Sequence, residues 1–346
     1  MKANVLFGVD DLRYITFDKP SLNKGQVLLE VKAAGICGSD VARVFKNGTY
    51  HFPTIIGHEF SGVVKEVKDE KDQHLVNRRV SVYPLIPCGE CPSCRQGVYE
   101  TCAHYNYLGS RCDGGFAQYV AVPTWNLLPL PDEVTFEQAA MLEPCAVALH
   151  ALRKAKIGLG AKVAIFGPGT IGMLLCRMAR LAGAHVLLLG RTQQKLDHAE
   201  ELDLVDEICN VNMQNAHDWI LEHTDCQGVD VAIEGTGSAE VFGSCLQSVK
   251  AGGTLVCLGN PQGDFFLEKN IYWQILRKQV TLLGTWNSSF AVPGNDWQRV
   301  LDLITDQLLH PERLITHRFP LSQLSKGLDL MRDRNVYTNK VMIINE

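Results

Sequence analysis

Short apolar runs separated by turn residues dominate the first 146 residues. The runs are rich in Val and are bounded by Gly, Pro or Asn, which is typical of β-strands. The clearest are 26–36 (QVLLEVKAAGI), 61–67 (SGVVKEV), 78–85 (RRVSVYPL) and 114–123 (GGFAQYVAVP). This pattern predicts a first domain that is mostly β.

A different pattern begins at residue 162. The apolar runs 162–167 (KVAIFG) and 185–190 (HVLLLG) are typical of buried strands. Between them, apolar residues recur at the spacing of one helix face, namely Ile171, Leu174, Leu175, Met178 and Leu181. A strand, a helix and a second strand within about 30 residues form a βαβ unit.

Three more apolar runs alternate with helical stretches, at 229–235, 252–259 and 280–286. Such alternation is typical of a doubly wound parallel sheet. The last apolar run, 340–345 (KVMIIN), is expected to return to the first domain as a strand. We therefore expect an α/β protein of two domains, a mostly β domain from 1–146 and 290–346 and a doubly wound domain at 147–289.

Composition narrows the class of protein. The 346 residues are 46% apolar, and their net charge of −5 gives no global attraction to nucleic acid or to an anionic membrane. No basic and apolar leader and no membrane-spanning apolar run are visible, so we expect no membrane partner. Twelve cysteines without a leader are typical of a reducing cytoplasm. There, clustered cysteines bind metal or react more often than they form disulfides.

A glycine-rich turn, GPGTIG, joins the first parallel strand to its helix. It places Gly167, Gly169 and Gly172 around Thr170 and Ile171, which open the helix. In this context the first glycine permits the tight turn, the second lets backbone approach a pyrophosphate, and the third permits close helix packing. The helix N-terminus faces the phosphates. The turn therefore predicts a dinucleotide site.

The acidic residue that an NAD site carries about 20 residues further on is absent. Gly190 ends the second strand, and Arg191 follows it. Loss of the carboxylate removes repulsion with a 2′-phosphate, and a guanidinium can pair with that phosphate. These residues favour NADP over NAD, although an arginine that only stacks on adenine or is solvated would suit NAD. Two further predicted cofactor contacts are Gly259 and Thr285.

Four cysteines gather in the segment 87–102, PCGECPSCRQGVYETC: Cys88, Cys91, Cys94 and Cys102. A common iron–sulfur segment closes with a shorter gap and a proline. Four thiolates with short gaps suit a closed tetrahedral zinc site, which leaves no position for a substrate. A nucleic-acid-binding module is disfavoured because the segment has no basic stripe. We predict a structural zinc lobe over residues 84–104.

A reactive metal would need other ligands. Candidates are Cys37 in GICGSD and His58 with Glu59 in IIGHEFSG. A catalytic zinc binds about three protein ligands among Cys, His and carboxylates and keeps one position open. The third ligand is either Glu59 or Glu143 of MLEPCAV, which comes just before the second domain.

Together these motifs resemble the zinc-containing medium-chain dehydrogenases. The resemblance rests on CGSDVARVFKNG, PTIIGHEFSG, PCGECPSCRQGVYETC, YLGSRCDGGFAQY, EPCAVALHA, GPGTIG and LRKQVTLLGTW. Within that family the chain is most similar to the polyol branch, which includes sorbitol and galactitol-1-phosphate dehydrogenases. The resemblance implies a GroES-like catalytic domain and a Rossmann domain. It also implies hydride transfer between NAD(P) and a secondary hydroxyl of a sugar alcohol, with one catalytic and one structural zinc per chain.

The resemblance also implies a ligand set for the catalytic zinc. Cys37, His58 and Glu143 would bind the metal, and Glu59 would lie beside it as an exchangeable or indirect ligand. A carboxylate in place of a second thiolate fits the polyol branch.

Proton transfer is implied in the same way. Ser39 would take the proton from the zinc-bound substrate oxygen, and Asp40 would support the ligands. Many alcohol dehydrogenases complete the relay with a His where this chain has Ala42. The proton must then leave through water or another group, for which His51 is the candidate.

Basic residues near the ligands raise the question of a phosphorylated substrate. Arg43, Lys46 and Arg111 could hold a phosphate, or they could be solvated loop charges. A polyol phosphate such as galactitol 1-phosphate is the expected substrate, and a free polyol is the alternative.

Two other functions are possible for a chain with this pattern. A zinc-free enone reductase would lack the ligand set, and a non-catalytic nucleotide-binding protein would bind the cofactor without turnover. The resemblance implies a homodimer or homotetramer that pairs through the edge strand at 280–286, and an unpaired apolar edge there would be a liability.

Overall fold

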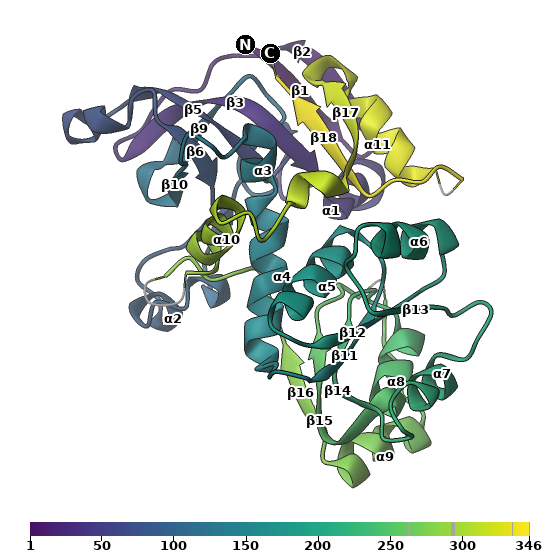
Figure 1. The fold of residues 1–346 in the computed structure, drawn as a ribbon. Helices are drawn as coiled ribbons and strands as arrows, with labels where there is room; N and C mark the ends of the chain where they lie inside the picture. The colour runs from purple at the N-terminus through teal and green to yellow at the C-terminus, as the bar shows by residue number, and fades with distance from the viewer. Residues whose placement is uncertain (262, 292–294, 334, 346) are drawn as a thin grey trace. The chain divides into compact units, whose positions relative to one another are not determined.

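The computed structural model describes residues 1–261, 263–291, 295–333 and 335–345. The chain divides into two compact units, Met1–Ala146 with Ser288–Glu346, and Val147–Asn287 (Figure 1). The first unit is discontinuous in sequence, because the whole second unit is inserted into it.

The first unit is built around a seven-stranded sheet, as its valine-rich runs predict. The strands are β3 (Gln26–Ile36), β5 (Glu59–Val67), β6 (Arg79–Val82), β9 (Tyr119–Pro123), β10 (Leu127–Pro129), β17 (Ile315–Pro320) and β18 (Lys340–Ile344). Strand β3 pairs antiparallel with β5, β9 and β18. Because β18 comes from the last apolar run, the expected return of the chain is confirmed.

Smaller elements complete this unit. A three-stranded sheet contains β1 (Lys2–Gly8), β2 (Asp11–Thr16) and β4 (Thr54–Ile55), and β7 (Leu85–Ile86) pairs with β8 (Asn106–Tyr107). The α-helices are α1 (Gly38–Ala42), α2 (Pro92–Arg95), α3 (Phe136–Ala140), α10 (Asp296–Thr305) and α11 (Leu324–Arg332), and α4 (Leu142–Ala155) begins in this unit and continues into the second. Short π or 3₁₀ helices are η1 (Arg43–Asn47), η2 (Glu70–Leu75), η3 (Tyr99–Thr101), η4 (Thr124–Asn126), η5 (Pro311–Leu314) and η6 (Leu321–Gln323). Apolar residues of both larger sheets, η6 and α11 form one core that includes Leu29, Phe60 and Phe116.

The second unit contains a six-stranded sheet in the order β13-β12-β11-β14-β15-β16. The strands are β11 (Lys162–Phe166), β12 (His185–Gly190), β13 (Glu207–Asn210), β14 (Val229–Glu234), β15 (Val249–Cys257) and β16 (Thr281–Gly284). All neighbours pair in parallel, so the predicted doubly wound fold is confirmed. Strand β13 was not predicted, because EICN is short and mixes polar with apolar residues.

Helices cover this sheet: α5 (Thr170–Leu181), α6 (Gln193–Glu201), α7 (Ala216–Glu222), α8 (Ala239–Ser248) and α9 (Lys269–Lys278). Residues of α7, α8 and α9 share a core with Phe166, Leu187 and Leu189. On α5, most of the predicted apolar face is buried, but its last member, Leu181, is 38% exposed. In the part of the chain that the structure describes, no helix has the length and apolarity needed to cross a membrane.

Candidate functional site

The four predicted structural ligands come together in one lobe. Their Sγ atoms, from Cys88, Cys91, Cys94 and Cys102, all lie within 4.8 Å of one another. Three of the separations are 3.9 Å (Cys88–Cys94), 3.9 Å (Cys91–Cys102) and 3.5 Å (Cys88–Cys102). Zinc at about 2.3 Å from four tetrahedral sulfurs requires about 3.8 Å between them, whereas a disulfide needs about 2 Å. The lobe therefore fits a closed zinc site.

Backbone N–H groups donate hydrogen bonds to sulfur atoms of this lobe. The Cys88 N–H donates to Cys102 Sγ at 3.3 Å. Backbone N–H groups of Cys94 and Ala103 lower the pKa of Cys91 to about 6, which favours the thiolate that zinc binds. Burial raises the pKa of Cys94 to about 12, and coordination by zinc deprotonates such a thiol.

Aromatic rings attach the lobe to the rest of its unit. Tyr99, on η3, has its ring centroid 5.0 Å from that of Trp125, and Trp125 lies 5.3 Å from Phe290. Phe290 in turn stacks on Tyr83 at 4.7 Å and meets Trp297 edge-on at 5.9 Å. The lobe is thus packed against residues far away in sequence, which the sequence pattern did not reveal.

A second group of metal-ligating side chains lies where β3 ends and β5 begins. One ligand atom from each of Cys37, His58 and Glu59 falls within 4.8 Å of the others. Cys37 follows β3 and caps α1, while Glu59 opens β5 opposite Gly35 of β3. The pairing of two strands therefore brings the two motifs together. Sulfur, nitrogen and oxygen donors in a buried setting suit a zinc that keeps one position open.

Asp40 connects the two halves of this metal group and is fully buried. One of its oxygens accepts the Cys37 N–H at 3.0 Å. The other lies 3.3 Å from His58 Nδ1, close enough for attraction but outside hydrogen-bond alignment. Burial alone would lower the pKa of His58, but Asp40 and Cys37 raise it well above its ordinary value. A carboxylate beside the ring orients a metal-binding His.

Glu143 lies outside the 4.8 Å group, on the first turn of α4. Its Oε1 accepts a hydrogen bond of 3.3 Å from the Tyr107 hydroxyl. Burial raises the pKa of Glu143 to about 7; His58 and Lys340 oppose this effect and Glu59 adds to it. Of the two candidate third ligands, Glu59 is the one with a carboxylate oxygen within 4.8 Å of ligand atoms of Cys37 and His58.

Lys340, at the start of β18, is a functional candidate that sequence reasoning missed. Its Nζ donates to Glu59 Oε2 and, at 3.2 Å, to the Ile36 carbonyl. The residue is only 3% exposed. The signal was present in the sequence, since Lys340 heads an otherwise apolar strand. Glu59 is thus shared between the metal group and a buried cation.

Arg43 is bound to two other predicted site residues. Its Nη1 donates to Ser39 Oγ at 3.0 Å and to Asp40 Oδ1 at 2.9 Å. The Arg43 side chain is 20% exposed. The structure therefore places Arg43 on the predicted proton carrier and on the carboxylate beside His58.

Arg111 has different surroundings. Its guanidinium carbon lies 4.1 Å from the centroid of Tyr50 and 4.5 Å from that of Tyr105, so two rings hold it. Within the described residues no carboxylate pairs with Arg111 or with the exposed Lys46. The ring nitrogens of His51 meet the Arg111 carbonyl oxygen and the Thr54 hydroxyl, each at 3.1 Å.

The glycine turn has the form that a pyrophosphate requires. Gly167 has a φ of +115°, and a Cβ on Gly172 would lie 1.9 Å from the Gly167 oxygen. A Cβ on Gly169 would meet nothing within 4 Å, and no side chain caps α5 there. The N-terminus of α5, at Thr170 and Ile171, therefore begins beside open space, which fits a bound phosphate.

The other predicted cofactor residues follow neighbouring strands at the same carboxyl edge of the sheet. Gly190 ends β12 beside the turn, and Arg191 is exposed. Gly259 follows β15. Thr285 follows β16, where its buried hydroxyl makes no hydrogen bond among the described residues. The edge thus offers an unsatisfied polar group and an anion-binding helix end, which fits a dinucleotide.

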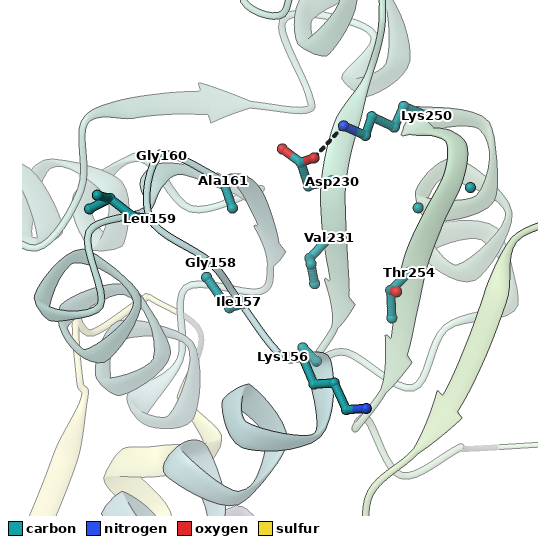
Figure 2. A pocket seen from close by; sticks show the side chains of 13 residues that line it. Lys156, Ile157, Gly158, Leu159, Gly160, Ala161, Asp230, Val231, Lys250 and Thr254 are labelled. Atoms are coloured by element: carbon teal, nitrogen blue, oxygen red, sulfur yellow. Dashed lines mark ion pairs between the residues drawn. The ribbon is translucent and has the colours of Figure 1, made fainter.

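A hollow of about 400 Å³ lies at the opposite, amino-terminal ends of the strands (Figure 2). The segment 155–161 and the first residues of β14 border it, and Lys250 pairs with Asp230 across its rim. None of the predicted site residues lines this hollow. The cofactor prediction therefore stays at the carboxyl edge.

Comparison with known proteins bears on this geometry. Residues 23–132 match the alcohol dehydrogenase GroES-like domain, and residues 170–306 match the zinc-binding dehydrogenase family. Galactitol 1-phosphate 5-dehydrogenase of Escherichia coli K12 is 32% identical over 326 residues, which are 93% of each chain. The chain belongs to the zinc-dependent medium-chain alcohol and polyol dehydrogenases. It is therefore an oxidoreductase of a zinc- and NAD(P)-linked family, as predicted.

Other members of the family are similar over nearly their full length. Sorbitol dehydrogenase of Bombyx mori is 32% identical over 342 residues, 95% of each chain. The crystal structure of galactitol-1-phosphate dehydrogenase from Escherichia coli gives a TM-score of 0.93 at 30% identity, covering 99% of this chain and 100% of that one. A zinc-binding dehydrogenase of Sinorhizobium meliloti 1021 bound to NADP gives 0.89 at 31% identity, covering 99% and 98%.

Proposed function

We propose that this dehydrogenase oxidises a secondary hydroxyl of a sugar-alcohol phosphate, such as galactitol 1-phosphate, with NADP as the acceptor. The reverse reaction would reduce the ketose phosphate. The observation that carries the proposal is the group of partly buried Cys37 with buried His58 and Glu59, with Ser39 two residues after the cysteine. The polyol dehydrogenases among its relatives support the substrate class.

Cys37 and His58 would hold the catalytic zinc together with one carboxylate. Glu143 is the third ligand that the family resemblance implies, and Glu59 is the carboxylate nearer to the other two. The hydrogen bond from Lys340 gives Glu59 a second partner, which supports an exchangeable role for it. When bound, zinc would supply Lewis-acid polarisation of the substrate oxygen, and the nicotinamide would supply the hydride acceptor.

Ser39 would receive the proton of the substrate hydroxyl. A hydroxyl oxygen has two acceptor positions, and Arg43 Nη1 occupies one of them. The second remains for the substrate, while the Ser39 hydrogen can be passed to water. Arg43 would therefore orient Ser39 rather than bind the substrate phosphate.

Arg111 is the stronger candidate for the substrate phosphate. Contact with the rings of Tyr50 and Tyr105 restricts the guanidinium, whose N–H groups would bind a bidentate anion. The exposed Lys46 would add charge. The alternative is that both are solvated, in which case the substrate is a free polyol, as for the sorbitol dehydrogenase relatives.

The test is a panel of C4–C6 polyols, each free and phosphorylated, assayed with NAD and NADP on zinc-loaded protein. We expect turnover of a phosphorylated polyol, and Arg111→Met should raise its KM by about tenfold or more, the loss expected for a bidentate charged contact. Turnover of free polyols only, with KM unaffected by Arg111→Met, would assign the alternative substrate.

The same assay separates the rival functions. Removal of zinc abolishes turnover if Cys37, His58 and a carboxylate bind a catalytic metal. Activity that survives removal would favour a zinc-free enone reductase. Nucleotide binding without turnover on any alcohol would indicate a non-catalytic protein.

We also propose a homodimer or homotetramer that works in a reducing compartment such as the cytoplasm. Strand β16 is the last strand of its sheet, and Leu282 is 42% exposed. An apolar edge of this kind is usually covered by pairing. The twelve free cysteines support the reducing compartment.

A further inference from the structure

The glycine turn and the end of β12 touch through Pro168 and Gly190. A Cβ placed on Gly190 would lie 2.4 Å from both Cδ and Cγ of Pro168. Carbon atoms in van der Waals contact are about 3.5–4.0 Å apart, and the proline ring cannot rotate away because it is fixed to its own backbone. Glycine is therefore the residue that fits at 190 while proline occupies 168.

This contact lies at the position that normally selects the cofactor. In a Rossmann site for NAD, an Asp or Glu at the end of the second strand binds the adenosine ribose hydroxyls. Here the ring of Pro168 fills the volume into which the side chain of such a residue would extend. Any acid at 190 must displace the ring and, with it, the turn from Gly167 to Gly169.

The neighbouring side chains carry the opposite charge. Arg191 is exposed, and its carbonyl is fixed by a 2.9 Å hydrogen bond from the Asn212 amide. Lys195 lies half-buried on the first turn of α6. Across the described ranges, neither cation is paired with a carboxylate. Burial lowers the pKa of Lys195, as expected for a cation without a counter-charge.

We propose that Pro168 and Gly190 form a steric lock on cofactor choice, which keeps out the acid that selects NAD and leaves the 2′-phosphate of NADP to Arg191 and Lys195. The inference rests on the proposed function in placing a dinucleotide at this edge of the sheet and in naming it as NADP. It adds that two positions 22 residues apart in sequence act as one selectivity element.

The experiment compares four zinc-loaded proteins: wild type, Gly190→Asp, Pro168→Ala and the double variant. The dissociation constants of NADP and NAD are measured by calorimetry without substrate, and the melting temperature is measured alongside. Wild type and Pro168→Ala should bind NADP about tenfold or more tightly than NAD, which is the difference expected from one charged contact. The Gly190→Asp variant alone should bind NADP much more weakly than wild type and bind NAD only slightly more tightly. Its melting temperature should be lower. The double variant should recover its melting temperature and prefer NAD, because contacting residues couple.

Three further variants separate the steric effect at residue 190 from the charge effect of the two cations. Gly190→Ala adds only the Cβ, so it should lower the melting temperature unless Pro168 is also replaced. Arg191→Met and Lys195→Met should each weaken NADP several-fold and leave NAD unchanged.

Two results would overturn the inference. If Gly190→Asp alone bound NAD as tightly as the double variant at the wild-type melting temperature, Pro168 would not be part of a lock. If wild type bound NAD as tightly as NADP, the assignment of the phosphate would be wrong. Because no substrate is present, neither result depends on which polyol, if any, is turned over.

Discussion

Two arginines that are equivalent as sequence candidates differ once their neighbours are known. Arg43 donates to Ser39 and Asp40, whereas Arg111 contacts the rings of two tyrosines and pairs with no carboxylate in the described segments. The first arrangement orients a proton carrier, and the second prepares an anion site. Substitution of each residue should therefore affect different kinetic constants.

Arg43→Met should lower kcat by about 10- to 100-fold, as is typical when a residue supporting the metal ligands is lost. The KM for the polyol should change much less, and Arg43→Lys should restore part of kcat because it keeps one donor and the charge. Steady-state kinetics with a zinc determination on each variant check this. A rise in KM at constant kcat would return Arg43 to the role of a substrate ligand.

Lys340→Met would leave the Glu59 carboxylate buried without its cation. Breaking a buried pair in this way costs about 3–5 kcal/mol, so the free energy of unfolding in urea should fall by that amount. The matched control is Lys65→Met, in the same sheet, because Lys65 pairs with Glu30 at 3.1 Å and is 39% exposed. The control should lose about 1 kcal/mol or less. Equal losses in the two variants would contradict a special role for Lys340.

The sequence identified residues whose chemistry is visible in a short segment. Cys37, His58 and the four lobe cysteines were found because ligand type and spacing are local. Lys340 and Pro168 were not found, because their roles depend on contacts with residues far away in the chain. Spacing alone left Glu59 and Glu143 as alternatives for the same reason, and the family resemblance implied Glu143. Only the pairing of β3 with β5 brings Glu59 to Cys37.

Among the elements, the cysteine lobe is the one whose removal should be most easily measured. Cys94→Ser should reduce bound zinc from about two ions per chain to about one, because a tetrahedral site loses one of its four ligands. Tryptophan emission should change as well, since Tyr99 of the lobe packs on Trp125. Metal analysis and fluorescence check this, with Cys226→Ser as the control because Cys226 is exposed. Retention of both ions in Cys94→Ser would contradict the assignment.

Strands and helices were predicted where period and composition agree. β3 and β12 have the predicted bounds, because valine- and leucine-rich runs there end at turn residues. β13 was missed because the pairing of Glu207–Asn210 with β12, rather than its own composition, makes it a strand. The exposure of Leu181 shows the limit of periodicity at a helix end, where the helix passes beyond the sheet that it covers.

For the whole molecule, the exposed edge of β16 leads to a prediction about assembly. Leu282→Lys should shift the protein from an oligomer to a monomer, because a charge at the pairing edge opposes strand addition. Light scattering after size exclusion checks the mass. Leu159→Lys is the control, since Leu159 is 92% exposed and lies away from this edge in sequence. A monomeric wild type, or an unchanged mass in Leu282→Lys, would rule out this interface.

The bond between Glu59 and Lys340 has a consequence for biosynthesis. The two residues are separated by 281 positions, so that at about 5–20 residues per second the ribosome needs roughly 15 to 55 s to deliver the cation after the acid. The whole inserted second unit is synthesised within that interval. The nascent first unit therefore has an acid without its counter-charge and a central strand without its last neighbour. The buried Glu59–Lys340 pair can therefore form only after residue 340 has been synthesised.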